Sequence, residues 1–149
     1  MSREMIQSQC ENLDIDVAFI NITATQLSKS IIDATVPVRD LLKNNGIHDY
    51  SSQEQGNHAK VTLEIFYLED YFEHEIPASK VTLYKPNSKR GDPRIWFTNL
   101  KKHVEAGDVL AVIPNETHDG LYAFNVADQE GFNAFISDKS AWLANKVGV

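Results

Sequence analysis

The clearest pattern along the chain is an alternation of hydrophobic and polar positions in residues 60–68. Apolar residues occupy every second position: Val61, Leu63, Ile65 and Tyr67. A two-residue period is typical of a strand with one buried face. Shorter apolar runs with many β-branched and aromatic residues predict further strands at 16–22, 80–84, 94–97, 109–113 and 121–126.

Helix signals occur at two places in the chain. A helix is expected from Thr35, a candidate N-cap, to Asn45-Gly46, where glycine ends it. A second helix is predicted at 128–136, capped by Asp128. The small, polar residues 23–30 are interpreted as a loop.

Six or seven short strands and two or three helices are therefore mixed along the chain. Strands do not alternate with long helices, which disfavours a doubly wound parallel sheet. We predict an α+β fold: a mainly β, open pseudobarrel of six to seven strands with two or three covering helices. One domain is expected over 1–149, with its core at 16–137 and terminal extensions at 1–15 and 138–149.

Composition agrees with a single globular domain. The chain has 149 residues, of which 42% are hydrophobic and 23% charged, which is ordinary for such a fold. It contains no run of 18 apolar residues, so we expect neither a membrane span nor a membrane partner. Its polar start lacks a secretory core, and Cys10 is the single cysteine. A cytoplasmic protein is therefore expected.

Charge is distributed unevenly around a formal net charge of −7. Residues 80–102 hold seven of the 14 basic residues and one acid, which gives +6 and leaves −13 on the remainder. Salt screens charges beyond about 8–10 Å, so a nearby ligand responds to the local charge. The protein can therefore present one basic face; the alternative is a solvated loop that balances nearby acids.

Signatures of catalysis do not occur in the sequence. It has no phosphate-binding glycine loop, zinc-protease motif or serine-hydrolase motif. None of the five histidines lies at metal-ligand spacing, and we expect them to be surface or loop residues. Carboxylates near Cys10 disfavour a thiolate, and the Glu-x-Lys of metal-dependent nucleases is missing. We predict no enzyme activity, no metal and no cofactor.

The remaining chemistry lies in residues 84–97. This segment mixes donors and acceptors of several kinds: Lys85, Asn87, Lys89, Arg90, Asp92 and Arg94. Arginine binds guanine O6 and N7 bidentately, or a phosphate, and asparagine reads adenine. Such a mixture suits base reading better than a patch of lysines. Trp96 we interpret as a core residue of a strand.

Two polar segments and a hairpin follow one another in a recognisable order. Residues 22–30 carry Thr25-Gln26, residues 89–96 carry Arg90, Asp92 and Arg94, and a hydrophobic hairpin and a helix close the pattern at 106–126 and 129–136. Over 16–137 this order resembles the N-terminal effector-binding, DNA-recognition domain of EcoRII-type restriction endonucleases. That domain is one of the DNA-binding pseudobarrels, which include plant B-three-type transcription factor domains. In the family, Asn-Asp stands in place of Thr25-Gln26.

The resemblance implies a protein that clamps the DNA major groove between two loops. It implies these DNA-facing candidates: Gln26, Ser28, Lys29, Lys85, Asn87, Lys89, Arg90, Asp92 and Arg94. We therefore hypothesise non-catalytic, sequence-selective binding of double-stranded DNA in a restriction or defence system. The protein would act alone or direct a separate nuclease or other subunit.

Two alternatives remain at this point. One is an acidic protein-interaction module or DNA mimic, in which residues 63–75, with Phe66, Tyr67, Tyr71 and Phe72, bind a basic partner. The other is an enzyme of unrecognised type, which would need a deep pocket joining His103 or His118 to a carboxylate.

Overall fold

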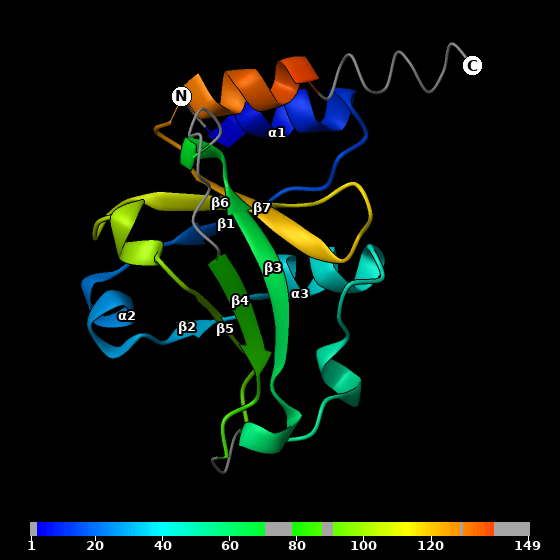
Figure 1. Ribbon diagram of the computed structural model, residues 1–149, viewed down its shortest axis with the longest axis vertical. Coiled ribbons are helices and arrows are strands. Elements are labelled where there is room, and N and C mark those ends of the chain that lie inside the picture. Colours follow the sequence, from blue (N-terminus) through cyan, green and yellow to red (C-terminus); the bar gives the residue numbers. More distant parts are fainter. Residues whose placement is uncertain (1–2, 71–78, 88–90, 129, 139–149) are drawn as a thin grey trace.

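Seven strands form one curled sheet in the computed structural model, which describes residues 3–70, 79–87, 91–128 and 130–138. The strands are β1 (Ala18–Asn21), β2 (Ile32–Asp33), β3 (Val61–Tyr67), β4 (Ser79–Tyr84), β5 (Arg94–Phe97), β6 (Val109–Pro114) and β7 (Gly120–Asn125). Their order across the sheet is β1-β6-β7-β3-β4-β5-β2. Neighbours in this described sheet are antiparallel, apart from the parallel pair β3–β7. The sheet curls into an open half-barrel (Figure 1).

Helices pack on both faces of the sheet. They are α1 (Arg3–Asn12), α2 (Ala24–Lys29), α3 (Val36–Asn44) and a helix at 130–138, with short 3₁₀ turns η1 (Tyr50–Ser52), η2 (Asn57–Ala59), η3 (Leu68–Asp70) and η4 (Leu100–Lys102). Helix α3 packs against the main core, and α1 and the helix 130–138 pack against a second core. Figure 1 shows α1 and the orange-red helix 130–138 together above the sheet, where both contribute to one hydrophobic core.

Two hydrophobic cores lie on the two faces of the sheet, and β6 belongs to both. Leu110 and Val112 point into the main core inside the curl, whereas Ala111 and Ile113 point into the second core. A strand covered on both faces reads as a continuous apolar run, as 109–113 does. The second core contains Ile6 and Cys10 of α1 together with Phe124, Phe132 and Phe135.

The fold class predicted from the sequence is confirmed. The alternation in 60–68 also holds, because Ile65 and Tyr67 are buried while Thr62 and Glu64 are exposed. The prediction of a loop at 23–30 is wrong, since these residues hold α2. α1 was not predicted. In the part of the chain that is described, no helix is long and apolar enough to cross a membrane.

Candidate nucleic-acid interface

The pairing register of β4, β5 and β2 determines which of their side chains form the outer face of the sheet. Five residues of these strands point into the main core: Val81, Leu83, Ile95, Phe97 and Ile32. Their neighbours therefore point outward. Thr82 lies opposite Trp96, and in the next row Tyr84 lies opposite Arg94, which lies opposite Asp33. Trp96 is half-buried and packs against the main core from the side, in part as expected.

Charged and aromatic groups are paired along the second row. Lys60 Nζ lies 4.9 Å from the centroid of the Tyr84 ring, within cation–π range. Arg94 Nε lies 3.2 Å from Asp33 Oδ1, yet the Nε–H makes no hydrogen bond, so the contact is an ion pair. The side chain of Arg94 is 24% exposed and that of Asp33 is 73% exposed. The row thus presents a cation, a ring, a cation and a carboxylate.

The predicted first recognition segment is a short helix held by its cap. Thr23 Oγ1 accepts from the backbone N–H of Gln26, and Gln26 Oε1 accepts from the N–H of Thr23. This capping box engages the carbonyl end of the Gln26 side chain. Ser28 donates to the carbonyl of Thr25 at 3.2 Å. Lys29, in the last turn, is exposed and is the candidate of this segment most open to a ligand.

The predicted second segment is tied to the residues before β3. The Gly56 N–H donates to the carbonyl of Lys85 at 3.0 Å. Gly91 has a φ of +57°, and a Cβ there would lie 1.7 Å from Gln55 Nε2, so glycine permits both the left-handed turn and the close approach. Asn87 and Asp92 are exposed and Lys85 is half-buried. Lys89 and Arg90 lie outside the described residues.

The pairing of β2 with β5 fixes where the two segments stand. Ile32 lies opposite Ile95 and Asp33 opposite Arg94, and the Ala34 N–H donates to the carbonyl of Pro93. Because the pair is antiparallel, α2, which precedes β2, lies toward the end of β5, and residues 91–93, the described end of the second segment, lie at its start. The two candidate segments therefore stand at opposite ends of the β2–β5 pair.

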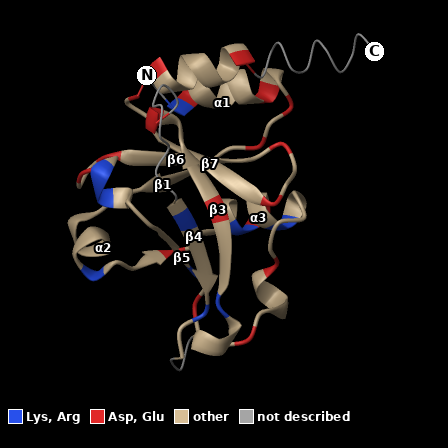
Figure 2. Cartoon of the chain, viewed as in Figure 1, with Lys and Arg blue, Asp and Glu red and all other residues tan. Residues whose placement is uncertain are grey.

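The structure brings other basic residues to the same part of the molecule. Lys101 and Lys102 of η4 are exposed and follow β5. Figure 2 shows blue positions at α2, at η4 and in the lower loops beside β3 and β4, and red positions on the helices at the upper end. Basic positions also lie on α3 and at the start of α1 (Figure 2), so charge is only partly divided among the described residues. Asp33, Glu64 and Asp92 are acids on or beside the basic face.

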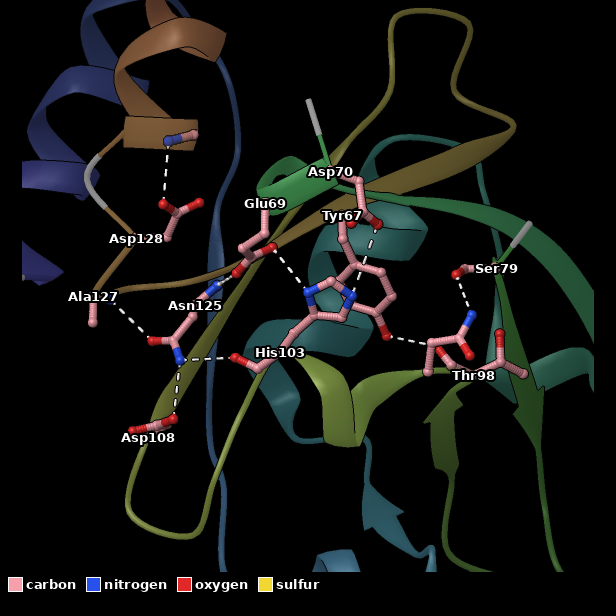
Figure 3. A network of polar contacts seen from close by, with 12 residues as sticks. Tyr67, Glu69, Asp70, Ser79, Thr98, His103, Asp108, Asn125, Ala127 and Asp128 are labelled. Atoms are coloured by element: carbon pink, nitrogen blue, oxygen red, sulfur yellow. Dashed lines mark hydrogen bonds and ion pairs between the residues drawn. The ribbon is translucent and has the colours of Figure 1, made fainter. Parts of the chain in front are cut away.

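A cluster of polar side chains around His103 is buried behind this face. The His103 ring stacks on Tyr67 with centroids 3.8 Å apart. Its Nδ1 lies 3.6 Å from Glu69 Oε2 and its Nε2 lies 3.8 Å from Asp70 Oδ2. Figure 3 shows the ring between these carboxylates, with Asn125 beyond Glu69. Only 8% of the His103 side chain is exposed, so it is a loop histidine, as expected, but it is not at the surface.

Burial shifts the ionisation of this cluster. It raises the pKa of Glu69 from 4.5 to about 7, although the Asn125 N–H donates to Glu69 Oε1 at 2.6 Å and favours the charged form. Glu69 Oε2 accepts no hydrogen bond from the described residues. Burial lowers the pKa of His103, against the attraction of Asp70 and Asp128 and together with the repulsion of Lys102. Both groups therefore favour their neutral forms.

The cluster joins a histidine to carboxylates, as the enzyme alternative required. Three cavities outlined by described residues have walls that do not include this cluster. Sequence reasoning missed the cluster because 34 positions separate Glu69 from His103 and no spacing rule connects them. Cys10 offers no nucleophile, since burial raises its thiol pKa to about 12.

The acidic segment of the protein-binding alternative is altered by the same burial. Tyr67 is 1% exposed, and 21% of the Glu69 side chain is exposed. Tyr71 and Phe72 lie outside the described residues. Among the described residues of 63–75, Glu64 is exposed and the others are buried or half-buried. Thr62, just before the segment, is also exposed. The outer face of β4, β5 and β2 is the stronger candidate site.

Comparisons with known proteins add no family to this description. A scan of protein-family models, a search of curated proteins and a search of solved structures each found no match for the chain.

Proposed function

We propose that this protein binds double-stranded DNA, without catalysis and with sequence preference, on the outer face of β4, β5 and β2. The observation that carries the proposal is the position of α2 and residues 91–93 at opposite ends of the β2–β5 pair. Between them lie the paired Tyr84, Arg94 and Asp33. Two segments that flank a row of mixed donors and acceptors suit contact with both phosphates and base edges.

The dimensions of the row support this proposal. Tyr84, Arg94 and Asp33 sit on three adjacent strands, and adjacent strands are about 4.8 Å apart. The row therefore spans about 10 Å, comparable with the major groove of B-DNA, which is about 12 Å wide. The exposed Lys29 and the half-buried Lys85 flank the row and would contact phosphates.

The resemblance to EcoRII-type recognition domains supplies the proposed setting. On that basis the protein would select sites in a restriction or defence system, alone or for a separate nuclease chain. The acidic total charge adds a further expectation. Because charge elsewhere repels phosphates, binding to unselected DNA should be weak and readily lost with salt.

The test removes the two flanking lysines. We expect Lys29→Gln/Lys85→Gln to weaken binding to a labelled random-sequence duplex at least about tenfold, because two phosphate contacts are lost. The salt dependence, as log K against log salt concentration, should flatten by about 1.8. Fluorescence anisotropy at several salt concentrations measures both quantities.

A matched variant controls for total charge. Arg39→Gln/Lys43→Gln also removes two positive charges, but from α3, which packs against β1 and β6. This control should bind as the wild type does, apart from a small uniform loss. Equal weakening in the two double variants, with both folded, would contradict the proposed face.

A further inference from the structure

Asp33 is an acid on the face that is proposed to bind DNA, although DNA phosphates repel negative charge. Its carboxylate is 73% exposed and lies 3.2 Å from Arg94 Nε, directly across the β2–β5 pair. The pairing is firmly held, because Ile32 and Ile95 beneath it are both fully buried. A hydrogen bond from Tyr50 Oη to the carbonyl of Arg94 at 2.9 Å fixes the backbone of the arginine. Asp33 and Arg94 therefore face a ligand together.

The contact uses only one side of the guanidinium. Asp33 meets Nε, and the described residues give the two terminal amino groups of Arg94 no hydrogen bond or ion pair. An arginine held through Nε presents those two groups as a fork. A fork of two parallel N–H donors matches the O6 and N7 acceptors of guanine.

The neighbouring carboxylate decides between the two ligands that such a fork can bind. A phosphate carries a negative charge that Asp33 repels at short range. A base edge carries no net charge, so its acceptors keep their hydrogen bonds to Arg94 without that repulsion. Asp33 also accepts hydrogen bonds, and the group that a G·C pair offers beside guanine O6 is the N4 donor of cytosine.

We propose that Asp33 and Arg94 act as one unit that reads a G·C base pair in the major groove and excludes phosphate. This inference rests on the proposed function and adds to it the base pair and the residue that sets selectivity. Asp33 positions Arg94 through Nε and rejects the backbone, Arg94 contacts guanine, and Lys29 and Lys85 supply the phosphate contacts instead.

The first test compares two aspartates. A duplex enriched by selection from a randomised pool serves as the specific probe, and poly(dA-dT) as the non-specific probe. We expect Asp33→Asn to bind poly(dA-dT) about tenfold more tightly and to lose about tenfold in discrimination between the two probes. Asp33→Glu should restore part of the discrimination. Asp40→Asn removes the same charge from an exposed position on α3 and should leave the ratio of affinities unchanged.

The second test needs no variant, so it does not depend on folding of a mutant. Replacing guanines of the selected duplex one at a time with 7-deazaguanine removes the N7 acceptor. One guanine should lose about five- to tenfold in wild-type affinity, and Arg94→Lys should be insensitive to that replacement.

The outcomes separate this inference from the proposed function. If the wild type binds no duplex at low salt, both fail. If it binds duplex DNA but Asp33→Asn behaves like Asp40→Asn, or no single 7-deazaguanine weakens binding, then the role of Asp33 and Arg94 is overturned while DNA binding stands.

Discussion

Glu69 and Asp33 carry the same functional group in opposite surroundings. Asp33 is exposed to solvent and forms an ion pair with Arg94. Glu69 is mostly buried beside His103, and Asn125 is the residue whose backbone N–H it accepts. The exposed carboxylate can contact a ligand. The buried carboxylate makes the stability of the fold depend on pH, because it binds a proton more tightly in the folded protein.

Replacing Glu69 should change how stability depends on pH. The pKa of Glu69 is raised from 4.5 to about 7 by burial, so between these values the folded protein keeps a proton that the unfolded chain has lost. Raising the pH through this window therefore lowers the free energy of unfolding. We expect the gain of Glu69→Gln over wild type to be small at pH 5 and to reach about 2–3 kcal/mol at pH 8.

His103 contributes with the opposite sign. Its pKa is lowered below the ordinary value of 6.5, so its contribution to stability increases as the pH rises toward 6.5 and is constant above it.

Urea unfolding of wild type and Glu69→Gln at each pH isolates the contribution of the glutamate, and Glu105→Gln, at an exposed position, is the control. A difference between wild type and Glu69→Gln that is equal at pH 5 and pH 8 would refute this assignment.

At the scale of elements, α2 depends on its cap. The helix has six residues and buries none of them fully, so its hydrogen-bonded start matters more than packing. We expect Thr23→Ala to cost about 1 kcal/mol in stability and to speed amide exchange in 24–29. Duplex affinity should fall with it, because Lys29 is then less well placed.

Thr25→Ala is the matched control for α2. Thr25 lies in the same helix and its side chain takes no part in the capping box. Amide exchange and duplex affinity close to those of wild type are expected for it. Should both threonine variants lose affinity equally, the cap would not be the cause.

Strands could be predicted from the sequence better than helices, for a physical reason. β3 and β6 bury enough apolar area to show their periodicity in the sequence, as alternation in one and a continuous run in the other. α1 buries only Ile6 and Cys10, and two apolar positions four apart are a weak signal in a polar stretch. α2 carries its signal in the Thr23–Gln26 capping box, which the interpretation as a loop overlooked.

The candidate site was predictable only in part for the same reason. Local composition places Lys85, Asn87 and Asp92 in an exposed segment, as the structure has them. The partner of Arg94 was not predictable, since Asp33 reaches it only through the pairing of β2 with β5. Nor was the use of Gln26 in its own helix cap expected. The long-range pairing of Asp33 with Arg94 cannot be inferred from their spacing in the sequence.

At the scale of the whole molecule, the sheet separates two tasks. Its β1-β6-β7 part is covered by α1 and the helix 130–138, which enclose the second core. Its β4-β5-β2 part keeps an outer face with Tyr84, Arg94 and Trp96 only partly buried. Basic positions at α2, at η4 and in the lower loops lie around that open part, and others lie on α3 and at the start of α1 (Figure 2). The net charge of −7 thus describes neither end of the molecule.

The most direct test of the central proposal is an NMR titration of the ¹⁵N-labelled protein with a duplex at low salt. The account predicts shifts concentrated in the amides of β4, β5, β2, α2 and the described residues of the 85–93 segment, and little change in α1 and α3. No shifts with excess duplex, or shifts centred on α1 and α3, would contradict it.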